Sequence, residues 1–364
     1  MPPSANWTTF DILALSHIRS ITAASLRFAV ESSVSLEDFL GRQDLITRSK
    51  IKTENLFEKN NALLLRDLAA RQLELCVAAG VQVISFCDDS YPLLLREIHY
   101  PPALLYVRGR LEPNYVPVIG MVGTRKCTHY GQLTAERFAA DFAREGVVVC
   151  SGLAYGIDMR AHKAALKAGG KTYAVIASGI DRISPNYSAK FADEIAESGA
   201  VISEYRCGTA ALPAYFPQRN RIISGLSRAV VVVESAMSGG ALITAQFCFD
   251  QNRDLFAVPG NINSEKSAGT NMLIRKNMAT AALTPEDVMR ETGVKITSKT
   301  EMPALNFSHN AEQTIYEALT QEPRQIDELA AALAMPPQDI MSNLLMLEFK
   351  GMARQLPGKT FIRA

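Results

Sequence analysis

Residues 216–245, FPQRNRIISGLSRAVVVVESAMSGGALITA, contain the strand around which the fold is predicted to form. Residues 229–234 (AVVVVE) are a β-branched run without polar alternation, which is typical of a strand covered on both faces in a parallel sheet. The glycine-rich turn 238–240 separates this strand from the apolar, helix-permissive segment 241–249. Free backbone N–H groups gather at such a turn and attract anions.

The charges near this strand also favour an anionic partner. Residues 205–233 contain four Arg and no Asp, Glu or Lys. We therefore expect a phosphate-bearing partner beside the turn.

Length and composition indicate an ordinary soluble globular protein of two or three domains, since 48% of its 364 residues are hydrophobic and 21% are charged. The 38 basic and 37 acidic side chains give a net charge of +1, so any nucleic-acid site has to be a local patch. No apolar run approaches the roughly 20 residues that span a bilayer, and no signal-peptide pattern is found. We expect a cytoplasmic protein with no membrane partner.

Cysteine and histidine spacing predicts neither a metal site nor a cofactor. The six cysteines form no C-x-x-C pair, so we expect buried or half-buried free thiols at Cys76, Cys87, Cys127, Cys150, Cys207 and Cys248. The five histidines are dispersed, and no Ser/His/Asp or metal constellation can be read from them.

The two ends of the chain predict small domains. Residues 1–79 have helical apolar spacing and predict an all-α domain, either a SAM-like or helix-hairpin-helix-like nucleic-acid module or a packing and partner-contact domain. Residues 291–308 are polar and aperiodic, as in a linker. Residues 309–364 predict three helices and a hairpin, the order of a winged helix. The third of these helices is poor in basic residues, which favours protein contact over DNA.

In the central domain, residues 80–290, strand-like runs alternate with helical segments, and this order predicts a Rossmann-like, doubly wound parallel α/β sheet. Two short strands, 81–86 and 104–109, lead into it. The strands that alternate with helices are expected at 117–122, 147–150, 172–177, 200–203, 229–233 and 255–258.

In such a sheet the loops after the strands emerge at one edge, where ligands bind. The turns that should converge into a groove there are 123–125, 151–152, 178–179 and 238–240. Two nucleotide motifs are disfavoured. Residues 165–172 (ALKAGGKT) lack the first P-loop glycine, and residues 120–125 lack the G-x-G-x-x-G spacing of dinucleotide sites.

At these motifs the chain resembles the DNA-processing protein A (DprA, also called Smf) family of bacteria, from about residue 81 to 287 and more weakly at both ends. The matching motifs are 89–92 (DSYP), 123–125 (GTR), 130–131 (YG), 151–154 (SGLA), 156–158 (GID) with His162, 203–205 (SEY), 216–217 (FP), 219–227 (RNRIISGLS), 238–239 (SG), 244–245 (TA), 258–260 (VPG) and 269–271 (GTN).

The resemblance implies a homodimeric protein that binds single-stranded DNA in the Rossmann-like groove and loads the recombinase RecA during natural transformation. We expect no enzymatic activity. Arg125 would contact a phosphate, helped by the amides of Gly123 and Thr124. Phe216 would stack on a base, and neighbouring arginines would supply charge. The full set of expected DNA-binding residues is Gly123, Thr124, Arg125, Lys126, Ser151, Gly152, Phe216, Arg219, Asn220, Arg221, Ser238, Gly239, Gly240 and Thr244.

Two of these residues have an alternative interpretation, Phe216 as a core aromatic and Arg221 as a buried partner of Glu204 or Glu234. The chain also departs from the family pattern. Residues 212–214 (LPA) lack the usual lysine, and two further family elements are altered at 184–188 (SPNYS) and 277–279 (NMA). Side chains that could compensate for these DNA contacts are Lys126, Arg182 and Lys190.

Two competing functions remain open. Phosphoribohydrolase-like enzymes share the glycine turn after a strand and need an acidic residue beside it, for which Glu234 is the candidate; the other role open to Glu234 is capping the amides of its own loop. A nucleotide-sensing scaffold would bind mononucleotides tightly without catalysis.

Overall fold

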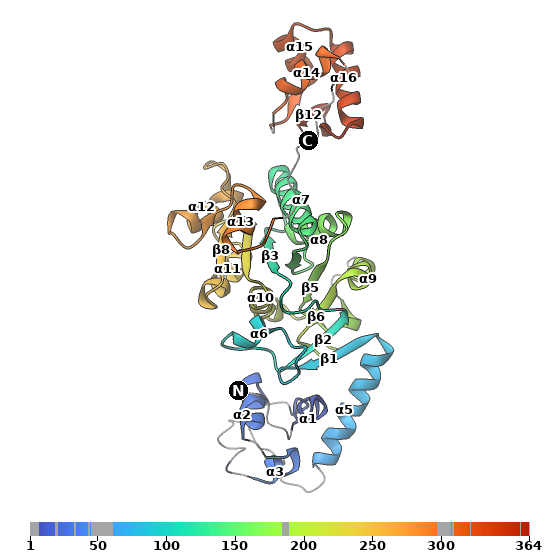
Figure 1. Cartoon of the computed structure of the whole chain (residues 1–364), viewed down its shortest axis with the longest axis vertical. Coiled ribbons are helices and arrows are strands. Elements are labelled where there is room, and N and C mark those ends of the chain that lie inside the picture. The colour runs from blue at the N-terminus through green and yellow to red at the C-terminus, as the bar shows by residue number, and fades with distance from the viewer. Residues whose placement is uncertain are drawn as a thin grey trace. The chain divides into compact units, whose positions relative to one another are not determined.

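The computed structural model divides into two compact units, residues 1–297 and 298–364 (Figure 1). The residues whose structure is described are 7–18, 21–32, 34–42, 44, 61–183, 189–296, 307, 309–320, 322–356 and 358–363.

The first unit is built on a nine-stranded sheet in the order β1-β2-β6-β5-β4-β3-β7-β8-β9. Its strands are β1 (Val81–Ser85), β2 (Leu104–Gly109), β3 (Val118–Gly123), β4 (Val148–Ser151), β5 (Thr172–Ile176), β6 (Ala200–Ser203), β7 (Ala229–Glu234), β8 (Asp254–Ala257) and β9 (Thr280–Ala281). All pairs from β6 to β9 are parallel, which confirms the doubly wound sheet. The two lead-in strands differ, because β1 and β2 join the edge at β6 as antiparallel strands.

Strand β7 lies inside the sheet and explains its own sequence. Val230 and Val232 pack with the helices on one face, and Val231 and Val233 pack with those on the other; all four are at most 1% exposed. Only apolar side chains suit a strand that is covered on both sides. The prediction from the AVVVVE run is therefore confirmed.

Helices cover both faces of the sheet. One face packs against α7 (His129–Arg144), α8 (Ile157–Lys167), α9 (Ala189–Ser198) and α13 (Pro285–Glu291). The other packs against α6 (Leu93–Glu97), α10 (Tyr215–Leu226), α11 (Ala241–Asp250) and α12 (Ala268–Arg275). Short 3₁₀ turns are η1 (Ile180–Arg182) and η3 (Glu265–Ser267).

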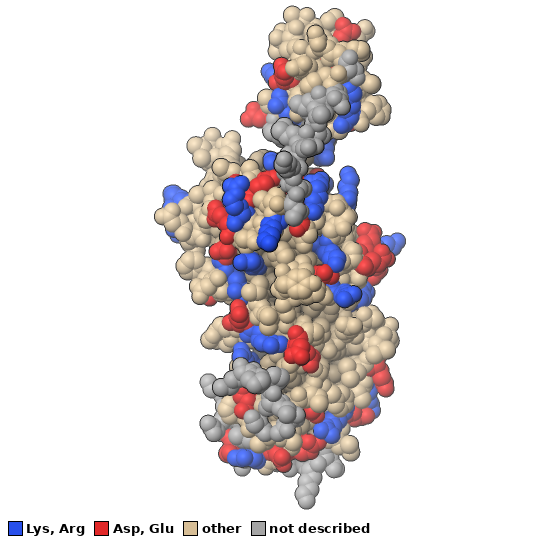
Figure 2. Space-filling view, in the orientation of Figure 1, with Lys and Arg blue, Asp and Glu red and all other residues tan. Residues whose placement is uncertain are grey.

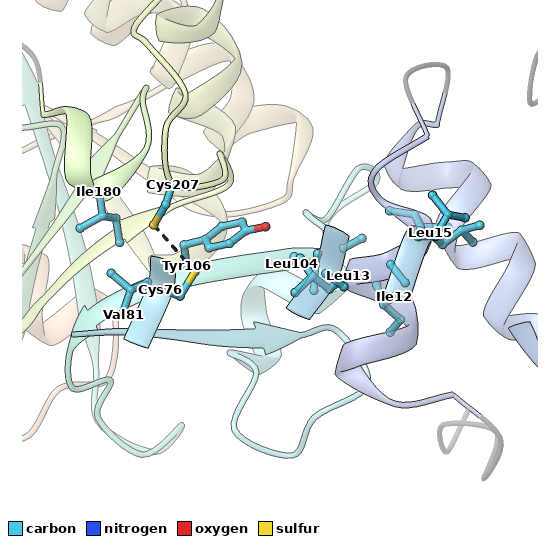
Figure 3. Packing of buried hydrophobic residues seen from close by; sticks show 14 of the residues in the cluster. Ile12, Leu13, Leu15, Cys76, Val81, Leu104, Tyr106, Ile180 and Cys207 are labelled. Atoms are coloured by element: carbon cyan, nitrogen blue, oxygen red, sulfur yellow. Dashed lines mark hydrogen bonds between the residues drawn. The ribbon is translucent and has the colours of Figure 1, made fainter. Parts of the chain in front are cut away.

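The N-terminal helices share a hydrophobic cluster with the sheet edge. They are α1 (Thr9–Leu15), α2 (Ala23–Glu31), α3 (Leu36–Gly41) and α5 (Asn61–Ala78). Figure 3 shows Leu13 of α1 beside Leu104 of β2, and Cys76 of α5 beside Tyr106 and Cys207. The Sγ atoms of Cys76 and Cys207 are 3.8 Å apart. The expected boundary at residue 79 stays a prediction, because these helices belong to the same compact unit as the sheet.

The free thiols follow the prediction, since each of the six cysteines is unpaired and either buried or half-buried.

The second unit is a winged helix. Its elements are α14 (Asn310–Ala318), β10 (Arg324–Gln325), α15 (Ile326–Leu333), α16 (Pro337–Phe349), β11 (Ala353–Leu356) and β12 (Thr360–Arg363). The strands form a sheet in the order β10-β12-β11, and the core includes Ile315, Leu329, Leu344 and Phe361. Strand β10 was not predicted. Most of the expected linker, residues 297–306 and 308, lies outside the described residues.

Among the described residues, no helix has the length and apolar character needed to cross a membrane.

Candidate nucleic-acid interface

A cavity of about 710 Å³ opens at the carboxyl ends of the parallel strands. Its walls are the turns after β3 and β4, the first turns of α10 and the start of α11. The expected DNA-binding residues that line it are Gly123, Thr124, Arg125, Gly152, Phe216, Arg219, Asn220, Gly239, Gly240 and Thr244. The sheet therefore brings together residues that lie up to 121 positions apart in the chain, from 123 to 244.

The fourth predicted turn does not join this cavity. Ser178 is buried, and the Gly179 amide donates to the carbonyl oxygen of Thr209 at 2.8 Å. The expectation that 178–179 lines the groove is therefore wrong.

Arg125 and Phe216 meet at the cavity. The Arg125 Cζ atom lies 5.8 Å from the centroid of the Phe216 ring, and the Arg125 side chain is exposed to solvent. Phe216 is half-buried on the first turn of α10, with its ring on the cavity wall. A cation close to an aromatic ring in one groove provides a phosphate contact and a stacking surface side by side.

The turns after β3 and β4 lie against each other through Gly156, the N-cap of α8. Gly156 has φ of 83°, and a Cβ atom there would collide with the Thr124 carbonyl and lie 2.6 Å from the Arg125 carbonyl oxygen. Only glycine suits this backbone and this contact. The approach places the Gly152–Gly156 turn directly beside Arg125.

The amide of Thr124 is already used inside the fold. It donates to the Glu234 carbonyl oxygen at 2.8 Å, so it is not available for a phosphate as expected. The start of α11 lies at the same cavity, and its N-cap Gly240 has no side chain to cap the helix. The amides of Leu242 and Ile243 donate to the carbonyl oxygens of Gly239, at 3.0 Å, and Gly240, at 3.2 Å, so what this helix start offers an anion is the positive end of its dipole.

Arg219 lies beneath the groove rather than free within it. Its side chain is buried, and its Nη1 donates to the carbonyl oxygens of Gly152, at 2.7 Å, and Val175. The expected contribution of charge to DNA is therefore replaced by a structural one, in which Arg219 joins the β4 and β5 ends.

Asp158 is the acidic partner of this floor. Its Oδ2 accepts from the amides of Gly152 at 3.2 Å and Ala154 at 3.4 Å. Burial raises the pKa of the Asp158 carboxyl to about 6, although the nearby Arg219 charge and these amides lower it. Burial also lowers the pKa of Arg219, and the charge of Asp158 opposes that change. The two charges thus compensate each other below the cavity.

Four expected residues lie off the cavity wall. Arg221 pairs with Glu204, with its Nη2 2.5 Å from Oε1, which decides between the two interpretations of Arg221 in favour of the ion pair. Ser151 is buried and donates to the Met121 carbonyl oxygen at 2.6 Å. The other two, Lys126 and Ser238, are exposed but do not line the cavity.

The compensating side chains for the missing lysine are not found on the described cavity wall. Pro213 lines the cavity, but Lys126, Arg182 and Lys190 do not. The altered element 184–188 lies outside the described residues. Arg125 is therefore the one exposed cation among the described lining residues.

Glu234 has a structural role different from the one expected. It is 1% exposed, and its carboxylate accepts from the Thr128 amide at 2.8 Å and the Thr128 hydroxyl at 2.6 Å. Thr128 is the N-cap of α7, so Glu234 supports that helix start and not its own loop. It does not line the cavity.

The expected DNA-binding residues did not include Tyr155 and Ile243, two large exposed side chains of the cavity wall. Tyr155 stands in the turn after β4, where an aromatic side chain beside glycines was the available signal. Whether its side chain faces the cavity depends on the backbone conformation of that turn, and this conformation cannot be predicted from the spacing of residues in the sequence.

Surface charge outside the groove is mixed. On the face drawn in Figure 2, Lys and Arg are interspersed with Asp and Glu. In the described parts of the chain, no group of three or more His, Cys, Asp or Glu residues could hold a metal ion.

Residues 82–293 match the family model of DNA recombination-mediator protein A, and residues 299–359 match the DprA winged helix domain. The chain belongs to the DNA recombination-mediator protein A family. A curated DprA-family relative, Protein Smf of Synechocystis sp., is 33% identical over 313 residues, covering 76% of this chain and 78% of that protein.

Solved DprA structures show the same fold. The X-ray structure of DNA processing protein A from Streptococcus pneumoniae aligns with a TM-score of 0.70 and 34% identity, covering 79% of this chain and 98% of that one. The protein from Helicobacter pylori, whose structure is described as showing a unique single-stranded DNA binding mode, aligns with a TM-score of 0.52 and 27% identity, covering 58% of this chain and 95% of that one.

Proposed function

We propose that the groove binds single-stranded DNA without sequence preference. The observation that carries the proposal is the exposed Arg125 guanidinium beside the Phe216 ring in a cavity lined by glycine turns. Arg125 suits a backbone phosphate, and Phe216 suits a base of any kind because every base has an aromatic face. Bases that are already unstacked can reach such a ring, which favours a single strand over a duplex.

We further propose that the chain passes this DNA to the recombinase RecA as a homodimer in the cytoplasm during natural transformation. Support comes from the family, whose description is that of a recombination mediator, and from the DNA-binding Helicobacter pylori relative. RecA assembly on DNA coated with single-strand-binding protein, with and without this chain, tests the loading step. Sedimentation tests the dimer.

We propose that the protein has no enzymatic activity of its own. Glu234, the acid that a phosphoribohydrolase-like reaction would need, is buried and holds the start of α7. Asp158 lines the cavity but already accepts two loop amides. Both carboxylates already have structural partners, which supports the proposal.

The central test measures the binding of fluorescent oligo-dT and of a matched duplex over a salt series. Affinity for oligo-dT should exceed that for the duplex and fall steeply with salt. Arg125→Ala should weaken binding about 10- to 100-fold, since a charge-assisted hydrogen bond is lost, and should reduce the salt slope by about 1.

Arg228→Ala is the matched control. Arg228 is exposed but precedes β7, at the end of the strand opposite the groove, and should leave binding unchanged. Binding that ignores salt, or equal effects of the two substitutions, would contradict the proposal.

A further inference from the structure

We propose that Tyr155 is a second base-stacking residue, so that the groove holds bases on two aromatic rings from different elements. The inference rests on the proposed binding of single-stranded DNA and adds to it. Phe216 comes from α10, whereas Tyr155 comes from the turn that joins β4 to α8. Both side chains line the same cavity.

The exposure of Tyr155 sets it apart within its turn. Tyr155 is 58% exposed, while Gly152 and Leu153 before it are buried. A large aromatic residue on a cavity wall provides a flat surface that water does not fully cover. Tyrosine carries this surface at low conformational cost, because only two torsion angles have to be fixed.

The backbone that carries Tyr155 is fixed before any ligand arrives. On one side, Leu153 adopts a left-handed backbone with φ of 58° and is 2% exposed. On the other, Gly156 packs against the Thr124 and Arg125 carbonyls. Asp158 holds the turn from inside through the amides of Gly152 and Ala154. A ring on such a turn loses little freedom on binding, so more of the stacking free energy is retained.

The position of Arg125 relates the two rings. Its guanidinium lies beside Phe216, and its carbonyl touches the turn of Tyr155 through Gly156. A phosphate on Arg125 therefore has an aromatic residue from each wall of the cavity near it, and the bases on either side of that phosphate are the ones that the two rings would receive. Stacking of this kind is tolerant of base identity.

The test compares Tyr155→Ala and Tyr155→Phe on two ligands, oligo-dT and an abasic oligonucleotide of equal length. Tyr155→Ala should raise the Kd for oligo-dT about tenfold and change the Kd for the abasic strand less than about twofold. Tyr155→Phe keeps the ring and should bind like the parent protein. Tyr115→Ala is the control, because Tyr115 is exposed but does not line the cavity.

An unchanged Kd of Tyr155→Ala for oligo-dT would overturn the inference, as would an equal loss on both strands, which indicates a change in the turn itself. Thermal unfolding of each variant shows whether the fold is intact, and crosslinking of 5-iodo-deoxyuridine DNA to Tyr155 in the parent protein tests the contact without any substitution. If Arg125→Ala weakens binding while Tyr155→Ala does not, only this inference fails. If the parent protein does not bind oligo-dT, the proposed function fails.

Discussion

The groove of the first unit and helix α16 of the second are both places where their folds commonly bind nucleic acid, yet their exposed side chains differ. The groove exposes Arg125 and Tyr155. Helix α16 contains no Lys or Arg, and its exposed side chains include Leu345, Met346 and Phe349.

The difference shows that the fold alone does not decide which surface binds DNA. The third helix of a winged helix often enters the major groove, but it needs cations to approach phosphates. The one cation at the end of α16 is Lys350, and its Nζ lies 2.6 Å from Oε2 of the buried Glu312. These side chains support the proposal that DNA binds in the groove, and we expect α16 to contact a protein.

The largest effect should come from separating the two turns that shape the groove. Gly156→Ala would push a Cβ atom into the Thr124 and Arg125 carbonyls and force a backbone angle that only glycine adopts readily. We expect DNA binding to fall at least as far as in Arg125→Ala, and the free energy of unfolding to fall by about 2–4 kcal/mol. Fluorescence anisotropy and denaturant unfolding measure the two losses.

Gly169→Ala is the matched control for that substitution. Gly169 also has a positive φ, of 76°, but a Cβ atom there would meet nothing within 4 Å. It should cost about 1 kcal/mol of stability and leave DNA affinity unchanged. If Gly169→Ala weakened binding as much as Gly156→Ala, the effect would belong to general destabilisation and not to the groove.

Removing the ring of Phe216 should have the next largest effect. Phe216→Ala is expected to weaken binding of oligo-dT by about 1–3 kcal/mol, because one base loses its stacking partner. Phe216→Tyr should bind like the parent protein. Since Phe216 is half-buried and on the cavity wall, a melting temperature close to that of the parent would separate lost stacking from lost packing. An unchanged affinity for oligo-dT would show that Phe216 does not stack on a base, and the contrast between the groove and α16 would then depend on Arg125 and Tyr155.

Much of the fold could be predicted because single strands carry their own signal. The β-branched run of β7 specifies burial on both faces. Because the loops that follow parallel strands emerge at one edge of the sheet, Arg125 and Phe216 could be expected to lie close together, as they do. The pairing of β1 and β2 could not be predicted, because alternation identifies a strand but not its partner or direction. Strand β9 has two residues, too few for any periodicity.

The fate of individual arginines was harder to predict. Arg219 and Arg221 both stand near Phe216 in the sequence, and their spacing gives no sign that one turns inward. What draws Arg219 inside is a pair of carbonyl oxygens, one at Gly152 in the turn after β4 and one at Val175 in β5, which lie 67 and 44 positions away in the chain. Such acceptors belong to the tertiary structure alone.

A smaller effect should follow from Glu234→Gln, which tests whether the groove binds without catalysing. The glutamine side chain has one acceptor oxygen where the carboxylate has two, and its NH₂ group can only donate, so one of the two charge-assisted contacts from Thr128 is lost. We expect a loss of about 1–2 kcal/mol in unfolding free energy and little change in DNA affinity. Neither protein should release free base from nucleoside monophosphates, as followed by chromatography. If the parent protein releases free base and Glu234→Gln does not, the protein is a phosphoribohydrolase-like enzyme and this prediction is wrong.

The smallest effect should come from α16, where Leu345→Ser and Phe349→Ser should change the affinity for oligo-dT less than about twofold. Both residues are exposed, Phe349 at 88%, so neither substitution should change the free energy of unfolding by more than about 0.5 kcal/mol.

Leu344→Ser is the contrasting control, because Leu344 is fully buried and its loss should unfold the winged helix. If binding persists even in Leu344→Ser, the groove alone accounts for the DNA contact. If instead the two exposed substitutions weaken binding fivefold or more while the unit stays folded, α16 touches DNA through apolar side chains and the contrast with the groove disappears.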